Sequence, residues 1–260
     1  MASGKTRKIA VANEKGGVGK TATIVNLGAA LSQRGFDVLI VDMDPQFNAT
    51  QGLGIALEDG APSVYDLLQG DGKPAAADVV VPSRWPHLAC LPSVPDLAGS
   101  EVELVDVAGR ENRLREGLRG LDGRYDFILL DTPPSLSLLT VNVFAYADEV
   151  LIPCQTQPYA FAALNDLFDT IGAIRRGINP DLATTGVVAT FYDRRTRVSN
   201  HTLERLKSDA RYGPLLLNTV IRSNTTVAES ALVGKPVVFY RSGSFGAKDY
   251  VRLAEEVAGA

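Results

Sequence analysis

The sequence predicts an α/β fold in which a doubly wound, mainly parallel β-sheet is flanked by helices. Short runs rich in valine, isoleucine and leucine alternate with longer segments of helical periodicity along the whole chain. Some of these runs, such as Phe127–Leu130, are apolar at every position, as expected of central strands covered on both faces. Because the alternation is not interrupted, we expect a single domain over residues 1–260.

The expected elements follow one another in chain order. Apolar runs rich in β-branched residues predict strands at Lys8–Ala12, Asp37–Val41, His87–Leu91, Asp126–Leu130, Glu149–Ile152, Gly186–Phe191, Leu215–Thr219 and Pro236–Phe239. Apolar residues three or four positions apart predict helices at Lys20–Gln33, Glu101–Leu118, Tyr159–Arg175, His201–Arg211 and Lys248–Val257.

The composition excludes several classes of protein. A chain of 260 residues that is 45% hydrophobic is too apolar to be disordered. Its apolar runs are far shorter than the roughly 18–20 residues that cross a bilayer, and no apolar signal-peptide core follows the start. With only Cys90 and Cys154, a disulfide framework is not expected. We therefore expect a cytoplasmic protein with no membrane partner.

A glycine-rich loop follows the first expected strand and carries the strongest functional signal. It reads Asn-Glu-Lys-Gly-Gly-Val-Gly-Lys-Thr over residues 13–21 and leads directly into a helix. Glycines between a strand and a helix N-terminus let backbone N–H groups converge on a phosphate. Lys20 would add a full positive charge at the β- and γ-phosphates, and Thr21 would offer its hydroxyl to Mg²⁺. The loop predicts nucleotide phosphate binding.

The loop differs from the standard G-x-x-x-x-G-K-[ST] pattern at its start. Glu14 stands where the first glycine belongs, and an extra lysine, Lys15, precedes the glycine pair. Lys15 is either a solvated side chain at the loop entrance or a group that meets phosphate presented by a second subunit.

Carboxylates end two of the expected strands. Asp42 and Asp44 follow the second strand, and Asp131 follows Phe127–Leu130. Ligands of open α/β sheets bind at this carboxyl edge, where acidic groups near a triphosphate imply a metal between them. Alternation along an extended segment would point Asp42 and Asp44 the same way, although one of them could instead cap the following turn. The expected metal site combines Thr21, Asp44 and Asp131.

These motifs together resemble one family. Lys15–Thr21 resembles the deviant Walker A loop of the ParA/MinD group of P-loop ATPases, and Val41–Gln46, followed by Asn48–Thr50, is similar to the second motif of the ParA/Soj branch. Leu129–Pro134 resembles the family's Walker B segment, and Ala247–Val257 resembles its final helix. The resemblance covers nearly the whole chain.

The resemblance implies an ATP-dependent sandwich homodimer that hydrolyses ATP slowly. It implies that Lys15 contacts the partner subunit's nucleotide, that Lys20 contacts phosphate and that Asp44 orients the attacking water, which makes these the expected catalytic residues. It also implies ATP and Mg²⁺ as the cofactors. The expected ATP contacts are Lys15, Gly16, Gly17, Val18, Gly19, Lys20, Thr21 and Ala22, with Thr190, Phe191 and Asn218–Ile221 as candidates for the adenine pocket.

The last third of the chain is basic, although the whole chain has a net charge of −4. This charge predicts either a solvated surface or a face for polyanions, without any motif for reading bases. The family resemblance implies non-specific double-stranded DNA binding, here through Arg194, Arg195, Arg197, Arg222 and Lys248. Where the family often has Ile-Pro-Arg-Asn, this chain has Arg222 at the proline position and Ser223 at the arginine position.

We therefore expect an ATPase that segregates chromosome or plasmid DNA on the nucleoid, with a ParB-like partner that stimulates hydrolysis. One alternative is a ParA-like switch that positions a protein cargo, such as a chemotaxis array or a microcompartment. Another is a MinD-like membrane-associated ATPase, which would end in a basic amphipathic helix. The end of this chain, residues 251–260, is short and acidic, so this alternative is disfavoured.

Overall fold

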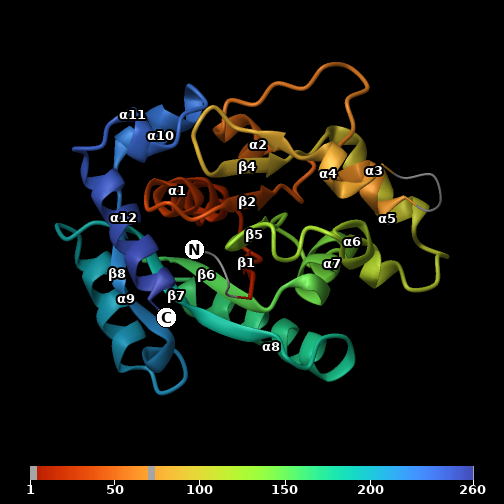
Figure 1. Cartoon of the computed structure of the whole chain (residues 1–260). Coiled ribbons are helices and arrows are strands. Elements are labelled where there is room, and N and C mark those ends of the chain that lie inside the picture. Colours follow the sequence, from red (N-terminus) through yellow and green to blue (C-terminus); the bar gives the residue numbers. More distant parts are fainter. Residues whose placement is uncertain (1–4, 70–73, 260) are drawn as a thin grey trace.

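The computed structural model describes residues 5–69 and 74–259. Within these residues, eight strands form one sheet in the order β3-β4-β2-β5-β1-β6-β7-β8 (Figure 1). Only β3 runs antiparallel to its neighbour, and the remaining pairs are parallel. The strands are β1 (Arg7–Val11), β2 (Val38–Val41), β3 (Val81–Pro82), β4 (Leu88–Leu91), β5 (Phe127–Asp131), β6 (Glu149–Gln155), β7 (Ala183–Tyr192) and β8 (Leu216–Arg222).

The helices occupy the connections between strands. They are α1 (Lys20–Gln33), α2 (Asn48–Gly52), α3 (Val64–Leu68), α4 (Ala76–Val79), α5 (Ser100–Glu103), α6 (Arg113–Gly117), α7 (Leu138–Tyr146), α8 (Ala160–Gly177), α9 (Arg197–Ser208), α10 (Thr225–Leu232), α11 (Val237–Tyr240) and α12 (Phe245–Ala258). Short 3₁₀ turns lie at η1 (Pro95–Gly99), η2 (Arg110–Asn112) and η3 (Gly213–Leu215).

Each face of the sheet has its own apolar core. Helices α1, α11 and α12 pack on one face, and α3, α6, α7 and α8 pack on the other (Figure 1). Side chains alternate between these cores along β1: Ile9 and Val11 lie in the core under α1, α11 and α12, while Ala10 lies in the core under α3, α6, α7 and α8. This two-sided burial explains strands that are apolar at every position, and the predicted fold class is confirmed.

The expectation of a strand at Pro236–Phe239 is wrong. Val237–Tyr240 forms the single helical turn α11, which follows Pro236 at a φ of −53°. The Val237 N–H donates to Asn26 Oδ1 at 2.6 Å, which docks this turn on α1. Because proline offers no N–H and the next N–H is already taken by α1, the segment is not available for a strand ladder.

The expectation of one continuous helix over Glu101–Leu118 is also wrong. That segment contains α5, η2 and α6, and Gly109 breaks the helical path with a φ of 72°. Helices α7 and α10 were not expected. Nearly all residues of α7 are buried, so its sequence lacks the apolar–polar contrast by which an amphipathic helix is detected.

Candidate nucleotide-binding site

The glycine-rich loop lies between the end of β1 and the start of α1, at the carboxyl edge of the sheet. Asn13 anchors its first turn: Asn13 Nδ2 donates to the Pro153 carbonyl at 2.8 Å, and Asn13 Oδ1 accepts from the Lys15 N–H at 2.9 Å. Gly16 and Gly17 are exposed, so their backbone is open to a ligand. The loop thus has a rigid base and an accessible rim.

A side chain from β7 supports the loop from below. Thr190 Oγ1 donates to the Val18 carbonyl at 2.8 Å, and both residues are only 2% exposed. The next residue, Phe191, is held at a φ of 50° with its ring against Gly19, where a Cβ would approach to 3.2 Å. The sequence indicated Thr190 as an adenine contact, and the structure shows its hydroxyl already engaged by the loop.

Lys20 is the buried cation of the site. It is 7% exposed, and its Nζ donates to the Lys15 carbonyl at 3.2 Å. Burial lowers the pKa of Lys20, while the nearby Asp131 and Asp44 carboxylates oppose this shift. A buried ammonium beneath an open glycine loop is stabilised by an anion, so the arrangement suits phosphate.

Asp131 presents the opposite charge at the end of β5. It is fully buried; its Oδ1 accepts the Thr132 N–H at 3.1 Å, whereas its Oδ2 has no hydrogen-bond partner. Burial first, and then the charge of Asp42, raise the pKa of Asp131, while the nearby Thr21 hydroxyl opposes this rise. An orphaned carboxylate oxygen beside a hydroxyl is the environment that a hydrated divalent cation would satisfy.

Asp42 and Asp44 have different hydrogen-bond partners. Asp42 Oδ2 accepts both the N–H and the hydroxyl of Thr50, each at 2.8 Å, so this carboxylate joins the end of β2 to α2. Burial raises the pKa of Asp42 to about 6 despite these bonds. Asp44 is 6% exposed, accepts the Gln46 N–H at 2.9 Å and lies near enough to Lys20 to influence its charge. Asp44 therefore lies near the lysine of the glycine loop, while Asp42 is held by Thr50.

The described residues contain no group of three or more His, Cys, Asp or Glu side chains that could hold a metal unaided. Magnesium is commonly held by one or two protein groups together with substrate phosphates. Thr21, Asp44 and Asp131 fit that mode, with Asp131 supplying the unpartnered oxygen.

Lys15 lies at the loop rim and is half-buried. Among the salt bridges of the described residues, none involves Lys15. The contact of its side chain with a second subunit therefore stays a prediction.

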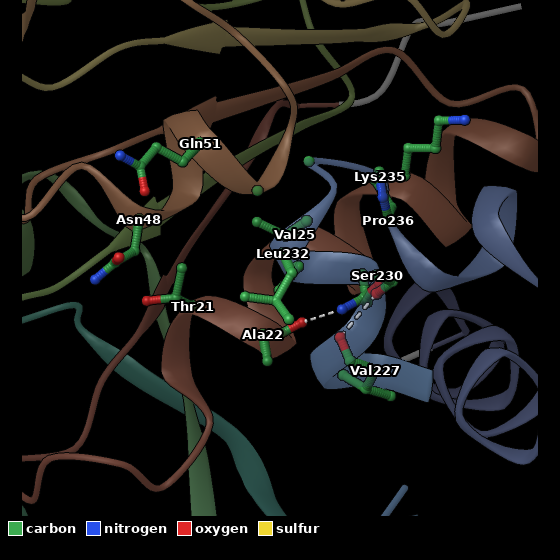
Figure 2. Close-up of a pocket in the computed structure, with 14 residues that line it drawn as sticks. Thr21, Ala22, Val25, Asn48, Gln51, Val227, Ser230, Leu232, Lys235 and Pro236 are labelled. Atoms are coloured by element: carbon green, nitrogen blue, oxygen red, sulfur yellow. Dashed lines mark hydrogen bonds between the residues drawn. The ribbon is translucent and has the colours of Figure 1, made fainter. Parts of the chain in front are cut away.

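A cavity of about 530 Å³ adjoins Thr21. Figure 2 shows that Thr21, Ala22 and Val25 line one side of it, with α2 and α10 around them. A smaller hollow beside Gly19 is lined by residues of β7, β8 and α10. The sequence did not single out α10, because this helix was not expected.

Asn218 lies in the first half of β8, away from the loop edge at Arg222. Its N–H and Nδ2 both donate to Glu256 Oε1, at 2.6 and 3.1 Å. Glu256 thus accepts hydrogen bonds from the backbone N–H and the side-chain amide of Asn218, and a contact of Asn218 with adenine stays a prediction.

The basic residues expected at DNA fall into two groups. Arg194, Arg195 and Arg197 are exposed in the turn before and at the start of α9, and Lys248 is exposed on α12. Arg195 forms two hydrogen bonds to Asp193 through its guanidinium and holds the pKa of that carboxyl at about 2.

Arg222 differs from these residues because its guanidinium makes contacts within the protein. Its guanidinium binds Asp249 through two hydrogen bonds and lies 4.4 Å from the Phe245 ring centroid. The side chain of Asp249 is only 2% exposed, so Arg222 neutralises a buried carboxylate. A DNA contact by Arg222 would compete with this pairing.

The anchored glycine loop, the buried Lys20 and the carboxylate edge define a P-loop nucleoside triphosphate-binding protein. Comparisons with known proteins identify the branch. A family model described as an AAA domain matches residues 6–184. The chain is 45% identical to the chromosome-partitioning ATPase Soj of Thermus thermophilus over 99% of its length and 97% of that protein's. It is 42% identical to the sporulation initiation inhibitor protein Soj of Bacillus subtilis, covering 96% and 97% of the two chains. The chain belongs to the ParA/Soj family of P-loop ATPases.

A solved structure described as cobyrinic acid a,c-diamide synthase from Mycobacterium smegmatis, with bound ADP and magnesium, is 35% identical to this chain. The match has a TM-score of 0.82 and covers 96% of this chain and 93% of that one. A second structure of the same protein holds an ATP analogue and magnesium. The predicted cofactors, ATP and Mg²⁺, are confirmed by these relatives. Among the described helices of this chain, none has the length and apolarity needed to span a membrane.

Proposed function

We propose that this protein is a partition ATPase: two subunits enclose ATP, the dimer binds double-stranded DNA non-specifically, and a ParB-like partner stimulates hydrolysis and release. The observation that carries the proposal is that the buried Lys20 and the unpartnered Asp131 oxygen lie near one another under an open glycine loop. This arrangement of a buried cation and an unpartnered carboxylate oxygen fits a magnesium-bound triphosphate, and relatives named as chromosome-partitioning proteins supply the biological context.

The residues of the site divide the chemical work. Lys20 neutralises charge on the β- and γ-phosphates, and the loop N–H groups orient them. Thr21 and Asp131 would hold Mg²⁺, which supplies charge neutralisation for the phosphate oxygens. Asp44 orients the attacking water. Lys15 of each subunit would approach the partner subunit's triphosphate, so that hydrolysis is slow until two copies meet.

The DNA face of this proposal consists of Arg194, Arg195, Arg197 and Lys248. Each phosphate contact should contribute about −0.9 to the slope of log affinity against log salt. ATP-dependent dimerisation would double the face and place the protein on the nucleoid.

Gel filtration and DNA binding with ATP, ADP and no nucleotide test the proposal. We expect dimers and DNA retention with ATP alone. Lys15→Ala should keep ATP binding in the monomer and lose the dimer. Lys5→Ala is the matched control, because Lys5 is an exposed lysine before the opposite end of β1, paired with Asp148 at 3.7 Å. Normal ATP dimers of Lys15→Ala would refute the role assigned to Lys15.

For the DNA face, replacing Arg194, Arg195 and Arg197 by alanine should lower the magnitude of the salt slope by about 2–3 per subunit. Alanine at three other exposed arginines, Arg119, Arg175 and Arg176, is the control. An equal loss in both variants would show that binding follows total charge rather than this face.

A further inference from the structure

Glu14 stands where the standard phosphate-loop pattern has its first glycine, and its side chain has a partner far along the chain. Glu14 Oε1 accepts a hydrogen bond from Thr170 Oγ1 of α8 at 2.8 Å, across 156 positions of sequence. Both residues are half-buried. The residue that departs from the loop pattern is therefore tied to a helix outside the loop. We call this hydrogen bond the Glu14–Thr170 tether.

The α8 end of the tether is fixed by the hydrophobic core. Leu167 and Ile171, on either side of Thr170 in the sequence, are 1% and 3% exposed and pack in the core under α8. Because close-packed interiors have little free volume, a helix held by such side chains is a rigid support. Thr170 therefore gives Glu14 a fixed point of attachment.

The main chain on either side of Glu14 is held as well. Asn13 Nδ2 donates to the Pro153 carbonyl of β6, and Asn13 Oδ1 accepts the Lys15 N–H. The Lys15 carbonyl accepts a hydrogen bond from Lys20 Nζ of α1. The loop entrance over residues 13–15 is thus attached to β6, to α1 and, through the tether, to α8.

The tether adjoins the lysine that the proposed function places at the subunit interface. Lys15 follows Glu14 directly in the chain. Burial raises the pKa of the Cys154 thiol to about 12, and the positive charge of Lys15 opposes this rise, so the ammonium lies near the carboxyl end of β6. The rotamers open to a side chain depend on its main-chain conformation, so an attachment at residue 14 limits the directions that Lys15 can take.

We propose that Glu14 and Thr170 are positioning residues: their hydrogen bond holds the loop entrance so that Lys15 is presented to the triphosphate of a second subunit. An attached glutamate then replaces the free rotation of the glycine in the standard pattern. The effect on the loop rests on the geometry alone. The effect on the dimer rests on the proposed function, since it requires Lys15 to act across the interface.

Three single variants test the tether. Thr170→Val removes the donor and keeps a β-branched side chain of similar size on α8. Glu14→Gln is the conservative variant, because its amide oxygen can still accept from Thr170. Thr185→Val is the matched control: Thr185 Oγ1 donates to Glu149 Oε2 at the same distance, 2.8 Å, near the amino ends of β7 and β6.

Hydrogen exchange of the Lys15 N–H, followed by NMR in the full chain without nucleotide, reports on the loop itself. This N–H donates to Asn13 Oδ1, so its exchange requires that bond to open. We expect exchange about tenfold faster in Thr170→Val, since a net hydrogen bond is worth about that factor. Glu14→Gln and Thr185→Val should exchange at the wild-type rate. Unchanged exchange in Thr170→Val, or an equal rise in Thr185→Val, would overturn the proposal.

Sedimentation with ATP measures the dimer. The ATP-dependent dimer of Thr170→Val should be about tenfold weaker than that of the wild type. The affinity of its monomer for ATP should change by less than about twofold, because Lys20 and the glycine N–H groups remain in place. Equal losses of ATP affinity and of dimerisation would show a merely structural contact and overturn the positioning role.

The double variant that combines Glu14→Gln with Thr170→Val separates position from charge. It should dimerise as weakly as Thr170→Val alone, because the tether is still absent. Recovery of wild-type dimerisation would assign the defect to the freed charge of Glu14 and overturn the proposal.

The two measurements together distinguish this inference from the proposed function. Faster exchange in Thr170→Val with no ATP dimer of the wild type would refute the proposed function and leave the tether standing. Faster exchange with an unchanged ATP dimer would overturn the part of the inference that concerns Lys15.

Discussion

The hydrogen bond from Thr190 to the glycine loop allows a quantitative test of how the sheet supports nucleotide binding. The Thr190 hydroxyl and the Val18 carbonyl are joined at 2.8 Å, and both residues are 2% exposed. Thr190→Val keeps the side-chain shape but removes the donor. Because water does not reach this position, the Val18 carbonyl would be left unsatisfied, at a cost of about 1–3 kcal/mol.

That cost corresponds to a factor of about 5–150 in an equilibrium constant. We expect part of this cost to lower the free energy of unfolding, measured by urea denaturation, and the rest to weaken the affinity for a fluorescent ATP analogue. Thr190→Ser is the matched control: it keeps the hydroxyl and loses one methyl group, so the loop should stay supported and ATP affinity should be close to that of the wild type.

The assay also separates support of the loop from contact with adenine. If Thr190 supports the loop, inorganic tripolyphosphate should lose affinity for Thr190→Val in parallel with ATP. If Thr190 contacts the base, only adenine nucleotides should be affected. Unchanged stability and unchanged affinity for ATP in Thr190→Val would refute the reasoning altogether.

Three further predictions follow from the same structure. Lys20→Ala should weaken ATP binding about 30-fold or more in nucleotide titrations. It should not lower the free energy of unfolding, because burial of the Lys20 ammonium is itself unfavourable. An affinity for ATP equal to that of the wild type would contradict this prediction. Arg222→Ala should lower the free energy of unfolding by about 1–3 kcal/mol, because the buried Asp249 carboxylate would lose its guanidinium partner and keep only the backbone N–H of residue 222. This loss should shrink in an Asp249→Asn background. Burial would raise the pKa of Glu149, but hydrogen bonds from Arg7 and Thr185 lower it below its usual value. The stabilisation by Glu149 should therefore be present above about pH 4.3 and be lost as the pH falls further. Urea denaturation curves of the wild type and Glu149→Gln should converge at acid pH. A difference in the free energy of unfolding that stays constant with pH would contradict the assignment.

Local sequence was sufficient for the elements whose chemistry is contained in neighbouring residues. The strand–loop–helix from Lys8 to Gln33 was predictable because its glycines, Lys20 and Thr21 lie within one continuous segment. The central strand before Asp131 was predictable from apolar residues on both faces. These segments also carry the family motifs, which is why the P-loop class and its cofactors could be predicted before any contact was known.

The tertiary structure decided everything that depends on residues far apart in the chain. It made Val237–Tyr240 a helical turn because the Val237 N–H meets Asn26 of α1. It gave Asp42 a partner in Thr50, while the Asp131 oxygen has none. The Ser93 N–H likewise finds its acceptor, Thr50 Oγ1, in a distant part of the chain. Sequence patterns report local conformation and burial, but which polar group finds a partner is settled by long-range packing, since a buried hydrogen bond depends on atoms that the local pattern does not contain.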